Sequence, residues 1–117
     1  MAFTCAIAVQ NGVAKLTLTG ELDAASAADF RAKIEVAAAQ RPRALVLLVE
    51  QLDYMASAGL RALVFAKQKM GADVDIYVVG AQESINETLE LTGFQNSVIS
   101  LTAYDAAMIE GRVVSGA

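Results

Sequence analysis

The sequence predicts a single α/β domain whose mixed sheet of four or five strands packs against about four helices. The first observation is the length, because 117 residues are enough for one hydrophobic core and too few for two ordinary ones. The second is Asn11-Gly12 between two strand-like segments, which is the strongest short-range signal for a hairpin. The third is the alternation of strand-like and helical segments after that hairpin, which is typical of βαβ units in a parallel sheet.

The chain is expected to begin with the hairpin and a first helix. Residues 5–9 and 13–19 are strand-like, and the second segment alternates polar and apolar side chains. Residues 20–23 are expected to leave the strand. Over about residues 24–39, apolar side chains recur at helical spacing, and Asp23 is placed to cap the start of this helix.

The middle of the chain predicts a buried strand, a loop and a second helix. Residues 44–49 (ALVLLV) are apolar without alternation, as in a parallel strand that is covered on both faces. A loop over residues 52–56 is expected to lead into a helix over about residues 58–70, which Gly71 closes. Ser57 lies at this junction, where open α/β sheets gather functional groups.

The rest of the chain is expected to form two strands and two helices. In order, these are a strand over residues 75–79, a helix over 84–92, a short edge strand over 98–101 and a helix over 102–110. Ser84 has the spacing of a capping box at the start of the third helix, and Gly93 stops that helix. We expect residues 1–117 to form one domain, with residues 111–117 as a loose tail.

Composition and charge argue against several classes of protein. The formal net charge of -4 argues against nucleic-acid binding, because contacts with phosphates need clustered lysine and arginine. The longest strongly apolar run, residues 44–49, is far shorter than the roughly 20 residues of a membrane helix. The N-terminus lacks the pattern of a signal peptide, and the lone Cys5 fits a reducing compartment. We therefore expect a cytoplasmic protein that does not insert into membranes.

Ser57 is not expected to be a catalytic nucleophile. A serine hydrolase needs a base for the hydroxyl proton, most often histidine, and the chain contains none. Lys67 and Lys69 would lie about two or more helical turns away. The chain also lacks a Walker A loop, a GxGxxG motif, a CxxC pair and a carboxylate dyad. We expect a protein that is not an enzyme, with no catalytic residue, no cofactor and no metal site.

Two interpretations of Ser57 remain open from its position. It can be a helix cap alone, or a site where a phosphate would meet the free N–H groups of the helix start. Helical spacing puts Ser57, Arg61, Phe65 and Gln68 on one face. This face is either a docking surface or a surface on which Phe65 packs under a neighbouring loop.

Three stretches of the chain together resemble the STAS domain, the fold shared by sulphate transporters and anti-sigma factor antagonists. They are residues 18–23 (LTGELD), residues 52–61 (LDYMASAGLR) and residues 89–94 (LELTGF). Together with the order of the expected strands and helices, these three stretches make the resemblance extend over nearly the whole chain. The resemblance implies a single STAS-like domain.

The resemblance also implies an anti-sigma factor antagonist of a bacterial partner-switching pathway. In this family, the serine that matches Ser57 is phosphorylated by an anti-sigma factor serine kinase, which ends binding, and a PP2C-type phosphatase resets the switch. The residue that matches Asp23 lies in the loop beside that serine. The partner-binding residues expected on this basis are Asp23, Ser57, Gly59, Leu60, Arg61 and Phe65.

The phosphorylation motif departs from the family pattern. Many members have Asp-Ser-Ser-Gly-Leu or Ser-Ser-Ala-Gly-Leu, where this chain has Ala56-Ser57-Ala58-Gly59-Leu60. Ala58 leaves Ser57 as the only phosphate acceptor of the motif. Two other functions remain open: an accessory STAS subunit that binds the ATPase of a lipid-transport ABC system, and a STAS sensor or scaffold without phosphorylation. The oligomeric state is open as well.

Overall fold

The computed structural model describes residues 2–104 and 109 as a five-stranded mixed sheet with three α-helices and one 3-10 helix. In chain order, the elements are β1 (Thr4–Gln10), β2 (Val13–Leu22), α1 (Ala27–Ala39), β3 (Ala44–Met55), α2 (Ser57–Met70), β4 (Asp75–Val79), α3 (Glu83–Thr92), the 3-10 helix η1 (Phe94–Ser97) and β5 (Ile99–Leu101). The α/β class and the mixed sheet are confirmed. The expected start of a fourth helix at residue 102 is wrong, because residues 102–104 are described and are not helical. The rest of that expected helix, apart from residue 109, and the tail expected over 111–117 lie outside the described residues.

The strands lie in the order β1-β2-β3-β4-β5, with β1 antiparallel to β2 and every later pair parallel. The hairpin turn forms at Asn11 and Gly12, with φ of 54° and 79°. Positive φ at both positions gives the twist that two tightly joined strands need. The predicted hairpin is therefore confirmed.

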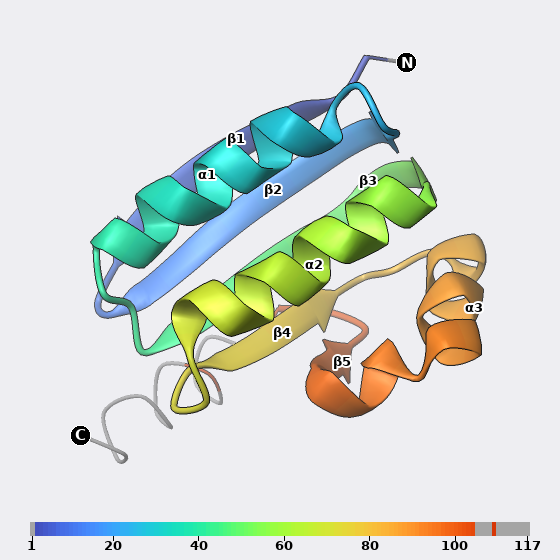
Figure 1. The fold of residues 1–117 in the computed structure, drawn as a ribbon. Coiled ribbons are helices and arrows are strands. Elements are labelled where there is room, and N and C mark those ends of the chain that lie inside the picture. The colour runs from blue at the N-terminus through green and yellow to red at the C-terminus, as the bar shows by residue number, and fades with distance from the viewer. Residues whose placement is uncertain (1, 105–108, 110–117) are drawn as a thin grey trace.

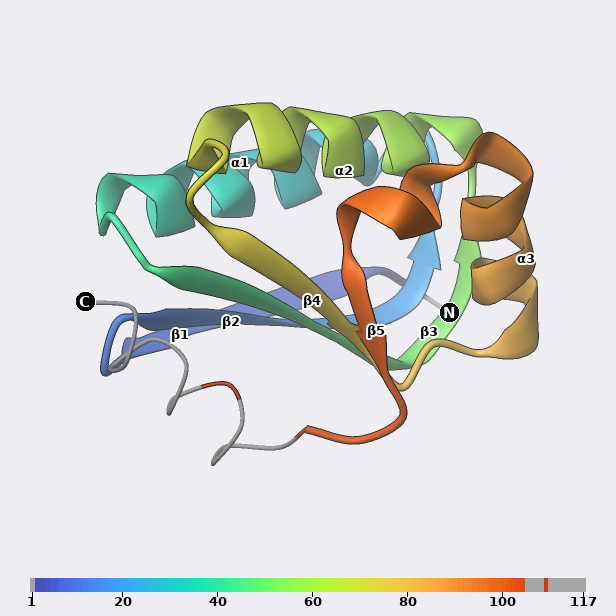
Figure 2. The ribbon, with the colours of Figure 1, turned by 90° about the horizontal axis from the view of Figure 1, so that it is seen from below.

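α1 and α2 lie side by side on one face of the sheet (Figure 1). Each helix connects two neighbouring parallel strands, and the chain crosses the sheet in one direction from β2 to β5. Because such crossovers share one handedness, successive helices fall on the same face. Figure 2 shows the resulting two layers, with α3 placed beyond the end of β3.

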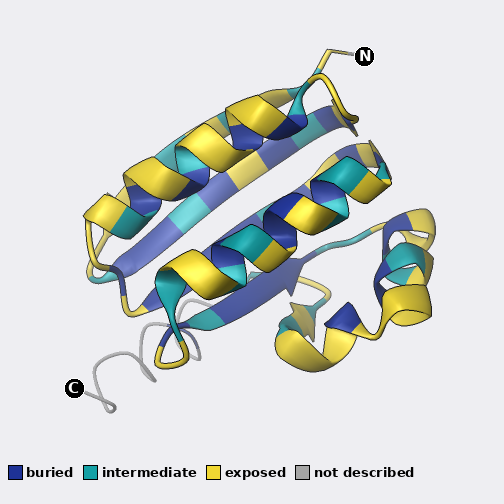
Figure 3. Cartoon of the chain, in the orientation of Figure 1, coloured by how far each residue is buried: buried dark blue, intermediate teal, exposed yellow. Residues whose placement is uncertain are grey.

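The largest core cluster fills the space between the sheet and these two helices. Strands β2, β3 and β4 and the sheet-facing sides of both helices are largely buried, whereas the outer sides of the helices are exposed (Figure 3). A smaller cluster on the opposite face of the sheet includes Val46, Tyr77 and Val79. β3 is thus apolar on both faces, which explains the absence of alternation in ALVLLV.

β2 and β3 are both longer than the sequence predicts. Residues 20–22 continue β2, and residues 50–55 continue β3. Between the pairs Thr17–Leu48 and Leu22–Met55, β3 advances seven residues while β2 advances five, through two irregularities in the register. The expected loop over 52–56 and the expected exit of 20–23 from the strand are therefore wrong, because the two segments pair with each other.

Two predicted helix starts are also wrong. The N-cap residue of α1 is Ser26, not Asp23, and that of α3 is Gln82, so Ser84 forms no capping box. Short polar side chains favour several turns near a helix start, and local spacing alone does not select among them. The predicted stop of α3 is confirmed, since Gly93 has the left-handed conformation with φ of 74°.

Candidate functional site

Ser57 is the first residue of α2 and follows almost directly from the end of β3. β3 ends at Met55, and Ala56 holds the N-cap position with φ of −78° and ψ of 170°. The prediction that Ser57 caps the helix is therefore wrong, because the cap position lies one residue earlier. The side chain of Ser57 is exposed, and its hydroxyl has no hydrogen-bond partner among the described residues.

A backbone hydrogen bond ties the start of α2 to the end of β2. Leu22 pairs with Met55 in the parallel register, and the N–H of Ala56 donates to the carbonyl oxygen of Leu22 at 2.8 Å. Asp23 comes directly after Leu22 in the chain, and Ser57 comes directly after Ala56. The turn that begins at Asp23 and the start of α2 therefore leave the sheet side by side (Figure 1).

The Asp23 carboxylate organises the turn before α1. Its Oδ1 accepts hydrogen bonds at 2.9 Å from the backbone N–H and from the hydroxyl of Ser26. These bonds, the backbone one first, hold the pKa of Asp23 below its ordinary value. Asp23 itself is exposed, so the turn presents a fixed negative charge beside the start of α2.

Gly59 lies where α2 comes closest to the sheet. It is buried, and a Cβ at this position would lie 2.7 Å from Cγ of Leu22 and 2.9 Å from Cγ of Met55. Contacts this short require the neighbouring side chains to move. The absence of a side chain at Gly59 therefore allows α2 to start close to the ends of β2 and β3.

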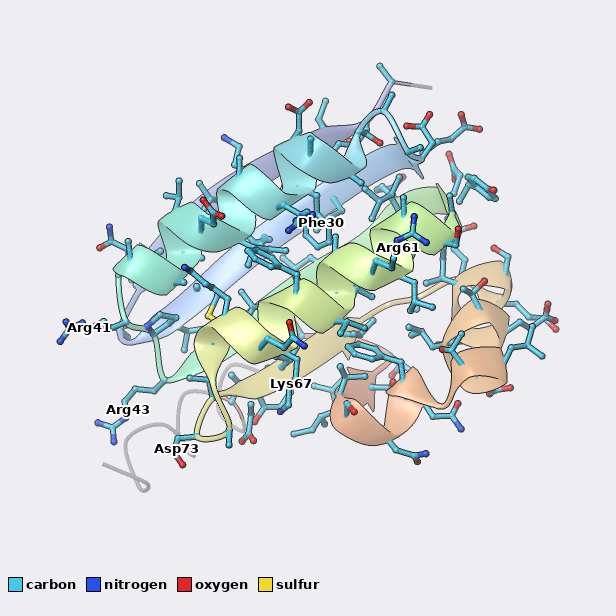
Figure 4. All side chains as sticks on the ribbon, in the orientation of Figure 1. Phe30, Arg41, Arg43, Arg61, Lys67 and Asp73 are labelled. Atoms are coloured by element: carbon cyan, nitrogen blue, oxygen red, sulfur yellow. The ribbon has the colours of Figure 1, made fainter. Side chains whose placement is uncertain are left out.

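Leu60 and Arg61, the next two residues of α2, differ in burial. Leu60 is half-buried and packs against the main core cluster. Arg61 is exposed on the outer side of the helix (Figure 4), and it has no ion-pair or hydrogen-bond partner in the part of the chain that the structure describes. Arg61 thus presents an available positive charge one helical turn after Ser57.

Phe65 turns toward α1 rather than toward solvent or a loop. Its side chain is half-buried against the main core, and the guanidinium carbon of Arg31 lies 4.5 Å from the centre of its ring. This is the geometry of a cation–π contact. Of the face predicted from helical spacing, Ser57, Arg61 and Gln68 are exposed, whereas Phe65 belongs to the contact between the two helices.

A groove of about 550 Å³ lies between the first half of α2 and the segment from Ala24 to Glu35, which includes most of α1. Its lining residues are Ala24, Ala27, Ala28, Arg31, Ala32, Glu35, Ala58, Arg61 and Ala62. Sequence reasoning found Arg61 but missed the residues of α1. The signal that could have found them is the four-residue spacing of Ala24, Ala28 and Ala32, which gives one face of a helix small side chains.

The described residues contain no group of three histidine, cysteine, aspartate or glutamate side chains that could hold a metal ion. No helix within residues 2–104 is long and apolar enough to cross a membrane. What the site offers is an exposed hydroxyl at the start of a helix, a carboxylate held in the turn after the neighbouring strand, and a groove with an available arginine. This arrangement suits binding and modification.

Comparison with known proteins finds similarity over most of the chain. The family model described as "STAS domain" matches residues 4–106. The anti-sigma-F factor antagonist RsfB of Mycobacterium tuberculosis is 31% identical over 104 residues, which are 88% of this chain and 85% of RsfB.

Two solved structures share the fold. An anti-sigma factor antagonist from Mycobacterium paratuberculosis superposes with a TM-score of 0.82 at 24% identity, over 92% of each chain. The Bacillus cell fate determinant SpoIIAA in its phosphorylated form superposes with a TM-score of 0.68 at 20% identity, over 94% of this chain and 98% of SpoIIAA.

Proposed function

The chain belongs to the STAS domain family, and from this premise we propose that it is an anti-sigma factor antagonist controlled by phosphorylation of Ser57. Its partner is an anti-sigma factor that is also a serine kinase, and a PP2C-type phosphatase removes the phosphate. The observation that carries the proposal is the exposed Ser57 hydroxyl, which has no partner among the described residues and begins α2. The relationship to RsfB, an anti-sigma-F factor antagonist, supports the general role.

The surroundings of Ser57 suit a phosphate. The first turn of α2 contains no acidic residue, and the free N–H groups of a helix start favour a negative charge. The side chains on either side are those of Ala56 and Ala58, which leave the hydroxyl accessible to a kinase. A phosphate at Ser57 would therefore fit the fold while adding charge and bulk to the surface.

The proposed switch acts by electrostatics at a docking surface. A phosphoserine carries a charge of about -1.5 to -2, and it would add to the fixed charge of Asp23 beside the start of α2. Of the partner-binding residues expected from the sequence, Arg61 is exposed on this surface, whereas Leu60 and Phe65 are half-buried and Gly59 sets the position of the helix. A partner that fits the uncharged serine would be repelled, and the phosphate would lose water on binding.

The chain is proposed to act as a regulator without catalysis of its own and without a cofactor. The kinase activity belongs to the anti-sigma factor, and the phosphatase activity to a separate enzyme. Because bacterial sigma factors act in the cytoplasm, the chain is proposed to act there as well.

The direct test is to incubate the purified chain with its anti-sigma factor kinase and ATP, and to locate the phosphate by mass spectrometry. We expect one phosphate at Ser57, and none in Ser57→Ala. Binding of the kinase should persist in Ser57→Ala and weaken in Ser57→Asp. A phosphate at another residue, or binding that Ser57→Asp leaves unchanged, would contradict the switch.

A further inference from the structure

We propose that the groove between α1 and α2 binds an acidic segment of the anti-sigma factor, with Arg61 contacting its carboxylates. The proposal rests on the function proposed above and names the surface through which that function acts. It brings α1 into a binding site that the sequence placed only around α2.

The shape of the groove favours an inserted segment over a flat contact. Six of its nine lining residues are alanines, from both helices. Alanine ends at Cβ, so the two helix surfaces leave an open volume of about 550 Å³ between them. Ala28 and Ala32 on α1 are exposed, so larger side chains of a partner can reach the groove from solvent.

The charge of the groove is opposite to that of the whole chain. The chain has a formal net charge of -4, whereas the charged residues that line the groove are Arg31, Arg61 and Glu35. Arg31 lies over the ring of Phe65, and Arg61 has no ion-pair partner among residues 2–104. A carboxylate of the partner would find in Arg61 a guanidinium that can form two parallel hydrogen bonds.

The groove lies next to Ser57 along α2. Ala58, the neighbour of Ser57 in sequence, is one of the residues that line the groove. Arg61 follows Ser57 by four residues in α2, a spacing at which helical side chains interact. A phosphate at Ser57 would therefore compete for Arg61 and repel an acidic segment in the groove. The same groove thus explains how phosphorylation releases the partner without unfolding the chain.

The test compares two kinds of substitution with matched controls, using calorimetric titration with the purified anti-sigma factor kinase. Arg61→Glu reverses the charge in the groove, and Lys69→Glu makes the same change at an exposed position of α2 that does not line it. We expect Arg61→Glu to weaken binding about tenfold or more. Lys69→Glu should change it by less than about twofold.

A second pair tests shape rather than charge. Ala32→Leu fills the groove from an exposed position, and Ala39→Leu adds the same atoms at an exposed position of α1 that does not line it. We expect Ala32→Leu to weaken binding about tenfold, and Ala39→Leu to leave it unchanged. Circular dichroism of all four variants should match that of the wild type, because every substituted position is exposed.

The outcomes separate the groove from the proposed function. If the wild type binds the kinase and both Arg61→Glu and Ala32→Leu bind equally well, the groove proposal is wrong and the function stands. If the wild type does not bind the kinase, the proposed function and the groove proposal both fail. If Ala32→Leu instead abolishes self-association in light scattering, the groove binds a second copy of the chain, which also overturns the proposal.

Discussion

At the scale of single residues, Asp23 and Ser26 form a closed turn. Asp23 Oδ1 accepts from the backbone N–H and the hydroxyl of Ser26, and the backbone N–H of Asp23 donates to Ser26 Oγ at 2.9 Å. Because these bonds favour the ionised carboxylate, they lower the pKa of Asp23. The turn beside the start of α2 therefore stays charged to a lower pH than an ordinary aspartate would.

We predict that replacing Ser26 with alanine raises the pKa of Asp23 toward its ordinary value. The substitution removes the hydroxyl bond and leaves the backbone bond, so the shift should be partial. Because the pKa is lowered in the folded chain, the stabilisation from this turn is present above the ordinary value and is lost as the pH falls through the folded value. Titration of the Asp23 carboxyl carbon by NMR measures the pKa, and urea denaturation at several pH values measures the change in stability. An equal pKa in the wild type and Ser26→Ala would contradict the role of the hydroxyl.

Ala56 gives α2 an N-cap without a side-chain acceptor. Its backbone has the extended conformation of a normal cap, but no side-chain hydrogen bond closes the helix start. The backbone N–H groups of the first turn of α2, which begins at Ser57, therefore have no side-chain acceptor. This is the chemistry on which the proposed phosphate site depends.

We predict that Ala56→Asn and Ala56→Asp raise the free energy of unfolding by about 1 kcal/mol, because either side chain can accept a helix N–H. Urea denaturation followed by circular dichroism measures the change. The two variants are matched in size, so a larger gain for Ala56→Asp would report the added attraction of a negative charge to the helix start. Stability below that of the wild type in both variants would contradict the assignment of Ala56 as the cap.

At the scale of elements, the position of α2 depends on its contact with β2 and β3 at Gly59. The Leu22 and Met55 side chains occupy the space that a Cβ at Gly59 would need. The same strand ends carry the hydrogen bond from Ala56 to Leu22. One close contact between three elements therefore sets where Ser57 and Arg61 lie.

We predict that Gly59→Ala lowers the free energy of unfolding by about 1–3 kcal/mol, the range of substitutions that overfill a core. In an exposed helix position, the same substitution would instead stabilise by up to about 1 kcal/mol. The sign of the change in stability, measured by thermal or urea denaturation, therefore shows whether Gly59 is closely packed or behaves as an exposed helix position. A variant as stable as the wild type would show that α2 can move away from the strands without cost.

At the scale of the whole molecule, stability is concentrated in the middle of the sheet. Strands β2, β3 and β4 each pair on both sides, whereas β1 and β5 are edges and β5 has three residues. α1 and α2 cover the main core over the central strands. The candidate site lies where β2 and β3 end, and at Leu22 and Met55 these two strands pair only with each other in the described sheet.

We predict that backbone amides in the centres of β2 and β3 exchange with solvent most slowly, at the rate of global unfolding. Amides of β5 and η1 should exchange by local opening, because few contacts must break to expose them. Hydrogen exchange followed by NMR or mass spectrometry measures this order. Equal protection of β5 and β3 would contradict it.

The sequence predicted the elements whose cause is local. Asn11-Gly12 forms the hairpin turn because these residue types tolerate positive φ. β4 spans the predicted residues, Asp75–Val79, and Gly93 ends α3 as expected. The central strand was recognisable because burial on both faces requires an unbroken apolar run such as residues 44–49.

The sequence also selected Ser57 and Asp23, through the junction of strand and helix and the resemblance to the STAS domain. It could not determine that β3 continues to Met55 or that Ala56 takes the cap position. Residues 50–55 mix polar and apolar side chains, and they become a strand only by pairing with residues 20–22. Pairing between segments so distant in the chain leaves no local pattern.

The groove between α1 and α2 depends on tertiary structure in the same way. In the sequence, Ala28 and Ala32 are ordinary helix residues. They line a groove only because the fold places α1 beside Ala58 and Arg61. The sequence by itself therefore determined the fold class, most elements and the serine at the centre of the site. The tertiary structure decided which side chains surround that serine, because the parallel sheet brings together residues that are more than 20 positions apart in the chain.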